Sequence, residues 1–487
     1  MDKNLTALKP ALVWKHFAQI VQIPRPSGHE EAIRQYIIDF AKAEGLEWKE
    51  DKAHNVYVRK PASEGMENRV GVVIQAHLDM VPQKNNDKQF DFLTDPIEAY
   101  IDGEWVTADG TTLGADNGIG AAAILAVLED KTLVHGPVEA LFTATEETGM
   151  DGAFGLEEGM LQGDILLNLD SETEGELYVG CAGGLDATTT FTYEAEPAPA
   201  CDCVALKVTA KGMKGGHSGI QIGYQRANAN KVLFRFLDAV SADCKCCLAS
   251  VDGGGLRNAI PREAEAVVLV PQEKKDAFVA ALAAYEKMII KEFEDIEDSI
   301  RIFAEEVAKP QEVMPAALSE KLIKAIIACP DGVQKMSMSM EGLVQTSTNL
   351  ARVVSDGKTV KVQCLLRSSV RSEKEFLGAR IAAVFSLAGG ETELSGAYDG
   401  WNPNMKSPIL AAMTTSYEQL YGKRPAVTAI HAGLECGIIG SKYPNLDMIS
   451  FGPTICYPHS PDEKVEIASV EKFYDFLLRT LENIPVK

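Results

Sequence analysis

Over the first 185 residues of the chain, stretches with the helical spacing of apolar residues alternate with short apolar runs typical of strands. Residues 14–43 carry apolar side chains at helical spacing, and NRVGVVIQAHLDM is an apolar run with a polar end, which predicts a buried strand. DNGIGAAAILAVLED then predicts the opening of a helix, and VEALFTATEE and ILLNLDSE predict two more strands. Strands that alternate with helices predict an α/β fold, with a mostly parallel sheet covered by helices on both faces.

This pattern stops near Gly183 and returns from Asp399. Between them the order of strands and helices predicts an α+β insert with two similar parts, and LARVVSDGKTVKVQCLLRSS predicts a hairpin that turns at Asp356-Gly357. SPILAAMTTSYEQLYG, LDMISFGPT and VEIASVEKFYDFLLRTLENI then predict a helix, a strand and a final helix. We therefore expect one α/β domain in two parts, residues 1–185 and 398–487, interrupted by an inserted α+β lid domain, residues 186–397.

Composition and charge narrow the classes of protein. The chain has 487 residues and a formal net charge of −23, and this charge argues against nucleic-acid binding and against anionic membranes. Its longest strongly apolar run, Ala121 to Leu128, is too short to span a bilayer, and the start of the chain predicts a helix without a secretory signal. Ten cysteines without a signal indicate a reducing compartment, so we expect a cytoplasmic protein.

Side chains of the metal-ligand type stand at the ends of predicted strands and near the start of a predicted helix. In open α/β sheets, sites form beyond the carboxyl ends of the strands. Imidazole and carboxylate groups without thiolate suit catalytic zinc, cobalt or manganese. The segments are AHLDM (His77, Asp79), GADNG (Asp116), ATEETG (Glu146, Glu147), NLDSE (Asp170) and YPHSP (His459).

The spacing within these segments fits a metal site. His77 and Asp79 are two apart, so on a strand they face the same way, and Asp79 could orient the His77 ring. Glu146 and Glu147 are adjacent and diverge, so one can bind metal while the other acts as a base. Each feature alone has an ordinary explanation, such as a packed histidine, a surface carboxylate or an N-cap aspartate. Their joint occurrence at element ends favours the metal site.

Taken together, these segments resemble the aminoacyl-histidine dipeptidases (Xaa-His dipeptidases, peptidase D, cytosolic non-specific dipeptidases). These belong to the co-catalytic zinc peptidase family, which includes carnosinases, bacterial tripeptidases and acyl-amino-acid deacylases. The resemblance runs from IPRPSGHEE to PHSPDEKVEI, and QAHLDMV, GADNGIG, EETGMDGA and GGHSG are specific in combination. LLNLDSE followed by GCAGG, and KGMKGGHSGI, point to the histidine-dipeptidase branch.

The resemblance implies two divalent metal ions, expected to be Zn²⁺, with Co²⁺ or Mn²⁺ as alternatives. One ion would be held by His77 and Asp170, the other by Glu147 and His459, and Asp116 would bridge both. Glu146 would be the general base and Asp79 would orient His77. The peptide bond between Asp116 and Asn117 is expected to be cis.

In the lid domain, the resemblance implies that His217 of GGHSG approaches the scissile carbonyl or its oxyanion. Further candidates for substrate contacts are Asn258, Arg367, His431 and Gly433, and the guanidinium fork of Arg367 suits a carboxylate. Two arrangements stay open: the lid histidine acts within its own chain, or a homodimer formed through the lid domain supplies it from the neighbouring subunit.

The expected function is metal-dependent hydrolysis of unblocked dipeptides, Xaa-His dipeptides included, by water activated at the metals with Glu146 as base. A tripeptidase or an N-acyl amino-acid deacylase would share this chemistry, and a non-catalytic binding protein would have lost a ligand or the base. Cysteines 201, 203, 244, 246 and 247 lack the paired spacing of a structural zinc site. A thiol protease using Cys436 or Cys456 would leave the acidic strand ends unexplained.

Overall fold

A computed structural model of the chain describes residues 3–244 and 246–487 and divides into two compact units. Unit 1 comprises the described residues within Met1–Cys181, Trp401–Ala429 and Leu434–Lys487, and unit 2 comprises Ala182–Gly400 and Ile430–Gly433. The unit boundaries thus differ from the expected domain boundaries by a few residues, because β9 (Gly183–Thr192) already belongs to the sheet of unit 2. Segment 430–433 also joins unit 2, where Ala182 N–H donates to the carbonyls of Ile430 and Ala432.

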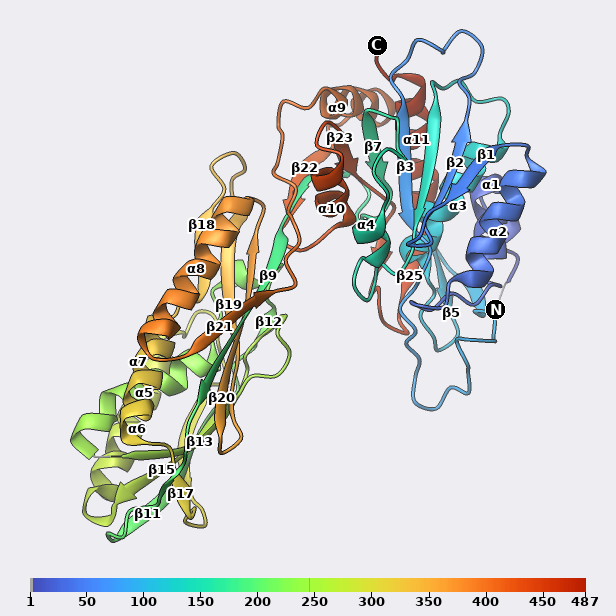
Figure 1. Cartoon of the computed structure of the whole chain (residues 1–487). Coiled ribbons are helices and arrows are strands. Elements are labelled where there is room, and N and C mark those ends of the chain that lie inside the picture. The colour runs from blue at the N-terminus through green and yellow to red at the C-terminus, as the bar shows by residue number, and fades with distance from the viewer. Residues whose placement is uncertain (1–2, 245) are drawn as a thin grey trace. The chain divides into compact units, whose positions relative to one another are not determined.

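Unit 1 is built on an eight-stranded sheet in the order β1-β2-β6-β3-β7-β23-β8-β22 (Figure 1). The central neighbours β6, β3, β7 and β23 pair in parallel, whereas β1, β2 and β8 pair antiparallel toward the edges. Every residue of β3, β6 and β7 is buried, so both faces of the central sheet are covered, as parallel strands require. The predicted α/β class is confirmed, and parallel pairing is limited to the middle of the sheet.

The helices of unit 1 follow from local sequence signals. Helix α9 (Pro408–Tyr421) begins at Ser407, whose side chain accepts from Leu410 N–H, and it ends at Gly422 in the left-handed conformation. Helix α3 packs on β3, and α9 and α10 pack on β23. The remaining elements of unit 1 are α1 (Ala11–Ile20), α2 (Glu31–Ala43), β1 (Glu47–Glu50), β2 (Val56–Lys60), β3 (Val72–His77), β4 (Ala99–Asp102), β5 (Trp105–Ala108), α3 (Ala115–Glu129), β6 (Val138–Thr143), α4 (Asp151–Gly155), β7 (Ile165–Asn168), β8 (Glu176–Cys181), β22 (Ala426–Ile430, its last residue in unit 2), α10 (Glu435–Lys442), β23 (Asp447–Ser450), β24 (Ile455–Cys456), β25 (Lys464–Glu466) and α11 (Ile467–Glu482).

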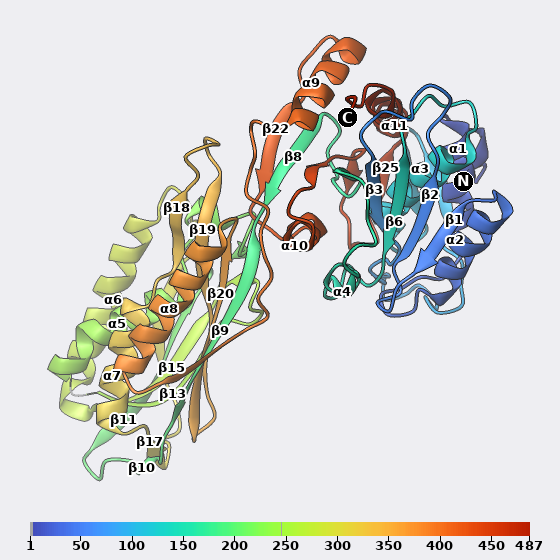
Figure 2. The same cartoon turned by 45° about the horizontal axis from the view of Figure 1, so that its top comes forward.

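Unit 2 is built on a nine-stranded antiparallel sheet with helices α5 to α8 on one face, and it also has two short two-stranded sheets, β10-β17 and β12-β14 (Figures 1 and 2). The two α+β parts expected from the sequence share this sheet, because β13 pairs with β19 across their junction. The predicted hairpin at Asp356-Gly357 is confirmed by β19 and β20. The elements of unit 2 are β9, β10 (Glu196–Pro197), β11 (Cys203–Lys211), β12 (Gly216–His217), α5 (Ala229–Cys244), β13 (Cys247–Gly253), β14 (Ala259–Ile260), β15 (Ala264–Pro271), α6 (Lys275–Glu292), β16 (Arg301–Glu306), β17 (Glu312–Val313), α7 (Ala316–Ala328), β18 (Gly332–Met336), β19 (Val344–Ser355), β20 (Thr359–Ser368), α8 (Arg371–Leu387) and β21 (Glu391–Ser395).

The core of unit 2 lies between this sheet and its helices. Phe191, Phe236 and Phe385 are buried there, and Phe191 and Phe385 meet edge to face. None of the described helices in either unit is both long enough and apolar enough to cross a membrane.

Candidate functional site

The carboxyl ends of three parallel strands in unit 1 bring three of the five predicted metal ligands together, His77, Glu147 and Asp170. His77 is the last residue of β3 and lies opposite Thr143, the last residue of β6. Glu146 and Glu147 follow β6, and Asp170 follows β7, which ends at Asn168 opposite Gln75. Because these strands run in the same direction, their polar ends meet at one edge of the sheet.

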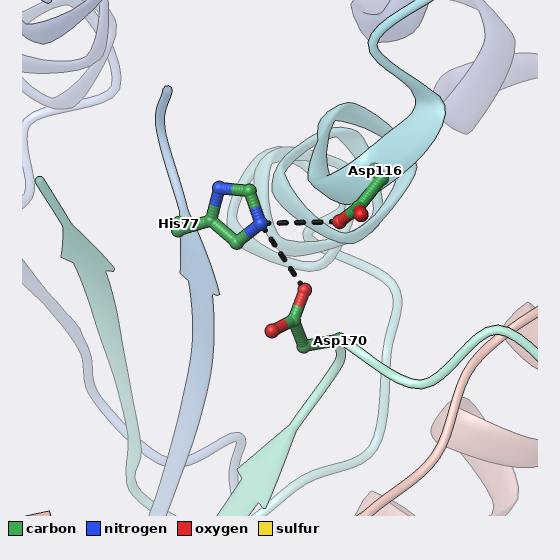
Figure 3. Close-up of side chains that lie close together, drawn as sticks. All are labelled: His77, Asp116 and Asp170. Atoms are coloured by element: carbon green, nitrogen blue, oxygen red, sulfur yellow. Dashed lines mark hydrogen bonds and ion pairs between the residues drawn. The ribbon is translucent and has the colours of Figure 1, made fainter. Parts of the chain in front are cut away.

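One group of side chains centres on the His77 ring. Nε2 of His77 lies 3.1 Å from Asp116 Oδ1 and 3.2 Å from Asp170 Oδ1 (Figure 3). Asp116 stands at the start of α3, and its peptide bond to Asn117 is cis, as the resemblance implied. All three side chains are buried or nearly so, with His77 at 1% exposure.

A second group shares Asp116 with the first. Nε2 of His459 lies 2.9 Å from Glu147 Oε2 and 3.4 Å from Asp116 Oδ2, so the two oxygens of Asp116 face different histidines. In each group, one ligand atom per residue lies within 4.8 Å of the others, and Glu146 and Glu147 form a further such group with His77. The structure therefore brings together all the side chains that the sequence nominated for metal binding.

Asp79 holds the residues at this edge of the sheet in place through its two carboxylate oxygens. Its Oδ1 accepts from Glu146 N–H at 2.9 Å, and its Oδ2 accepts from Glu147 N–H at 3.1 Å and from the Ser27 hydroxyl at 2.7 Å. Oδ1 also lies 3.3 Å from His77 Nδ1, which leaves Nε2 of the ring turned toward Asp116 and Asp170. The side chain thus fixes both the His77 ring and the backbone that carries the two glutamates.

The electrostatics of this region reflect an excess of carboxylates. Burial opposes protonation of His77, but Asp170, Asp116 and Asp79 outweigh it and hold the pKa of the ring well above its usual value. Hydrogen bonds to Asp116 and Glu147 raise the pKa of His459 to about 11. Burial and the charges of Asp116 and Glu147 outweigh the attraction of His77 and raise the pKa of Asp170 to about 6.

The residues fit divalent cations. Several buried carboxylates packed together are costly unless cationic charge compensates them. Oε1 of Glu147 is buried and has no hydrogen-bond partner, although buried polar atoms are nearly always paired. The donor atoms are imidazole nitrogens and carboxylate oxygens, the set that zinc, cobalt and manganese accept.

Two charged residues that the sequence analysis did not single out hold the loops of the site. Arg25 is fully buried and donates to the carbonyls of Leu78, Asp79 and Gly114. Glu463 accepts from the backbone N–H groups of Leu113, Gly114 and Asp116 at 2.8, 2.9 and 3.1 Å. Both lie in motifs quoted for the resemblance, IPRPSGHEE and PHSPDEKVEI, so that match was the available signal.

Unit 2 brings together three of the predicted substrate residues. A Cβ atom placed on Gly219 would lie 2.2 Å from the His431 carbonyl oxygen, 3.0 Å from the His217 ring and 3.1 Å from Arg367 Nε. Only glycine permits this close approach. Arg367 is 6% exposed, and its Nε has no hydrogen-bond partner, while His431 Nε2 pairs with the Ser347 hydroxyl at 2.7 Å.

The hydrogen bonds of His217 define its tautomer. Nδ1 accepts from the N–H groups of Gly219 and Ile220, both at 3.1 Å, so the proton of the neutral ring sits on Nε2. Burial and then the charge of Arg367 lower the pKa of His217 to about 4, which keeps the ring neutral. Asn258 is exposed next to Ala259, the strand partner of His217, and Gly433 shares segment 430–433 with His431.

The cysteines offer no competing site. Cys201 and Cys203 form a disulfide, which the expectation of a reducing compartment did not include, and eight cysteines are free. Within residues 3–244 and 246–487, the groups of side chains able to hold a metal ion contain histidine, aspartate and glutamate but no cysteine. Cys436 is fully buried, and burial raises the pKa of its thiol well above the ordinary value, which disfavours a nucleophilic role.

Comparison with known proteins agrees with this geometry. The chain is 47% identical over 484 residues to the cytosol non-specific dipeptidase of Escherichia coli (strain K12), covering 99% of this chain and 100% of that protein. It is also similar to the crystal structure of aminoacylhistidine dipeptidase from Vibrio alginolyticus, with 49% identity, a TM-score of 0.94 and 99% of each chain covered. A tripeptidase from Staphylococcus aureus shares the fold at 16% identity and a TM-score of 0.56, over 98% of this chain and 99% of that one.

The sequence pattern of one family extends over most of the chain. It matches residues 73–483, a stretch that begins just before His77 and ends beyond His459, and it therefore includes every side chain of the two groups that share Asp116. The chain belongs to peptidase family M20/M25/M40.

Proposed function

We propose that this chain is a metal-dependent dipeptidase that hydrolyses unblocked dipeptides, Xaa-His dipeptides included. The observation that carries the proposal is the pair of histidine–carboxylate groups that share Asp116 at the carboxyl edge of the sheet in unit 1. The two relatives at 47% and 49% identity, named as a non-specific dipeptidase and an aminoacylhistidine dipeptidase, support the dipeptide as substrate class.

In this proposal, His77 and Asp170 would hold one divalent cation, Glu147 and His459 the other, and Asp116 would contact both. Zn²⁺ is the first choice for this donor set, with Co²⁺ or Mn²⁺ as alternatives. When bound, such cations act as Lewis acids and lower the pKa of a water molecule toward ~7. Asp79 keeps His77 in position through Nδ1, so that Nε2 is presented as the ligand atom.

Glu146 is assigned the proton transfers. As general base it takes a proton from the attacking water, and it then delivers this proton to the nitrogen of the leaving amine. Its backbone N–H is held by Asp79 Oδ1, which fixes where the side chain begins. The adjacent Glu147 faces His459 instead, so the two glutamates can take separate roles.

Unit 2 is assigned the recognition of substrate. His217 donates from Nε2 to the carbonyl oxygen as negative charge develops there, a contact worth roughly 3–4 kcal/mol. Arg367 binds the free carboxylate of the peptide, and its unpaired Nε is a donor available for it. Asn258, His431 and Gly433 are further candidates for substrate contacts. We also propose a cytoplasmic location, from the name of the Escherichia coli relative, and leave a homodimer through unit 2 as an open alternative.

A panel of substrates separates this proposal from its alternatives. The metal-replete protein is expected to cleave β-alanyl-histidine, glycyl-histidine and other free dipeptides much faster than tripeptides or N-acetyl amino acids. A clear preference for tripeptides or for acetylated amino acids would assign the chain to a different activity with the same chemistry. If the metal-replete protein hydrolyses none of these substrates, the proposal is wrong and a binding protein is indicated.

A further inference from the structure

A buried chain of polar side chains crosses the central sheet of unit 1 one step below the candidate ligands. Gln75 lies two residues before His77 on β3, Thr143 ends β6, and Asn168 ends β7 two residues before Asp170. Side chains two apart on a strand share a face, so the Gln75 side chain points to the same side as that of His77. All three residues have 0% exposure.

Hydrogen bonds join these strands to helix α10. Gln75 Nε2 donates to Thr143 Oγ1 at 3.0 Å and to Glu435 Oε2 at 2.6 Å, and Gln75 Oε1 accepts from Asn168 Nδ2 at 2.5 Å. The Thr143 hydroxyl also donates to Glu435 Oε2 at 2.7 Å. The carboxylate of Glu435 therefore ties together the ends of two strands that lead directly to His77 and to the Glu146–Glu147 pair.

The charge of Glu435 is not explained by these bonds alone. Its side chain has 0% exposure, and Oε1 has no hydrogen-bond partner. A glutamine at this position could accept the same two hydrogen bonds with its amide oxygen. It would also avoid the cost of burying a carboxylate that has one oxygen without a hydrogen-bond partner. Burial, with the charges of Asp170 and Asp79 added, outweighs the attraction of His77 and raises the pKa of Glu435 to about 8, so a cation nearby is what favours the carboxylate form.

We propose that Glu435 is a positioning residue of the metal centre, which fixes the strand ends through Gln75 and Thr143 and adds negative charge that strengthens cation binding. The inference rests on the proposed function, because it assumes that His77 and its neighbours bind metal. The loss of outer residues that support the side chains of a metal site typically weakens metal binding by about 10- to 100-fold. Glu435 is expected to act in this range without touching substrate.

Glu435→Gln tests the charge, and Glu435→Ala tests charge and hydrogen bonds together. We expect Glu435→Gln to bind Zn²⁺ about 10- to 100-fold more weakly than the wild type, measured on the full chain by competition with a chromophoric chelator. The visible spectrum with Co²⁺ reports the same change independently of activity. Glu435→Ala is expected to bind Zn²⁺ at least as weakly and also to melt at a lower temperature in its metal-free form.

Glu139→Gln is the matched control. Glu139 is a buried carboxylate on the same strand β6, and its Oε2 also accepts two donors, the N–H groups of Gln162 and Gly163. It lies near the opposite end of the strand from Thr143, so its variant is expected to keep wild-type Zn²⁺ affinity.

The outcomes separate this inference from the function on which it rests. A wild-type chain that binds no Zn²⁺ or Co²⁺ would overturn both. If the wild type binds Zn²⁺ and Glu435→Gln binds it equally well, only the role of Glu435 is lost and the proposed function stands. A purely structural role would lower the melting temperature of metal-free Glu435→Gln and leave its Zn²⁺ affinity unchanged, which also contradicts the inference.

Discussion

At the scale of single residues, Thr145 shows how the site holds an unfavourable backbone conformation. Thr145 has a φ of 52°, a left-handed value that β-branched residues rarely adopt. Its N–H and its hydroxyl both donate to Glu30 Oε1 at 3.0 Å, and the following residue, Glu146, is held by Asp79. Strained residues persist where the surrounding structure over-determines them, and here the strain turns the chain at the proposed general base.

The role of Glu146 is tested by Glu146→Ala. We expect this variant to retain its metal content, because Glu147 and not Glu146 is the assigned ligand. Its turnover is expected to fall by about 10²- to 10⁴-fold, the contribution typical of a general base. Metal analysis and a dipeptidase assay measure the two properties, and Thr148→Ala at the neighbouring exposed position serves as control. Normal turnover of Glu146→Ala would remove Glu146 from its role.

His217 gives a prediction about pH. Because burial and Arg367 lower its pKa to about 4, the folded protein should keep this ring neutral at pH 5, whereas the unfolded chain takes up a proton near 6.5. The sign of the linkage is therefore a loss of folding stability as pH falls from 6.5 toward 4. Nitrogen NMR of histidine-labelled protein, assigned with His217→Gln, should show a neutral ring protonated on Nε2. Titration near pH 6.5, or a proton on Nδ1, would contradict this account.

The sequence predicted the ligand side chains better than the residues that support them. His77 and Asp170 stand where apolar runs turn polar, which is a local signal. The partners of Arg25 and Glu463 are tertiary, since Glu463 binds the N–H of Leu113 about 350 positions earlier in the chain. No periodicity in the sequence indicates which charged loop residue turns inward to satisfy distant backbone groups.

At the scale of elements, helix α3 depends on a cap from a distant segment. Gly114 precedes the helix and offers no side-chain cap, and the N–H groups of Leu113, Gly114 and Asp116 are instead accepted by Glu463. The first turn of a helix has orphan N–H groups that need acceptors. The position of Asp116 is thus set by a carboxylate that follows β24, near the other end of the chain.

We expect Glu463→Ala to destabilise the metal-free protein by about 3 kcal/mol or more, since it leaves three N–H groups, two buried and one part-buried, without their acceptor, each at about 1–3 kcal/mol. The displacement of Asp116 should weaken Zn²⁺ binding as well. Denaturant unfolding of the full chain, followed with a spectroscopic probe that lies in unit 1, measures the loss of stability. Asp462→Ala, at the exposed neighbouring position, should stay within about 0.5 kcal/mol of the wild type. Equal stability of the two variants would argue against the capping role.

Elements with strong local signals were predictable, and their order in the sheet was not. The hairpin was predicted from its turn residues Asp356-Gly357, and a helix was predicted over SPILAAMTTSYEQLYG, where the structure adds the cap at Ser407. Strand β23, however, pairs with β7 across a separation that spans the whole of unit 2. Strand order depends on which apolar faces pack together, and an apolar run alone does not indicate its neighbours.

At the scale of the whole molecule, the candidate residues divide between the two units. The proposed metal ligands and Glu146 belong to unit 1, whereas His217, Arg367 and His431 belong to unit 2. The sequence analysis placed His431 and Gly433 in the second part of the catalytic domain, because an α/β pattern resumes before them. Segment 430–433 instead belongs to unit 2, where the carbonyls of Ile430 and Ala432 accept from Ala182 N–H, a contact between segments about 250 residues apart.

This division predicts that variants in unit 2 change substrate recognition and leave the metal content intact. Arg367→Lys loses the planar fork, so KM for a free dipeptide should rise by about 10-fold or more. Dipeptide amides, which lack the carboxylate, should show no such difference between the variant and the wild type. Arg371→Lys, an exposed arginine in the same unit paired with Asp399, should behave as the wild type. An unchanged KM for Arg367→Lys would remove the carboxylate contact.

The central claim, that two adjacent cations in unit 1 carry the reaction, is tested most directly by metal content measured together with activity. The account predicts two divalent ions per chain, loss of dipeptide hydrolysis when a chelator removes them, and recovery when Zn²⁺, Co²⁺ or Mn²⁺ is restored. A purified chain that contains no metal and hydrolyses dipeptides at the same rate in the presence of chelator would contradict it.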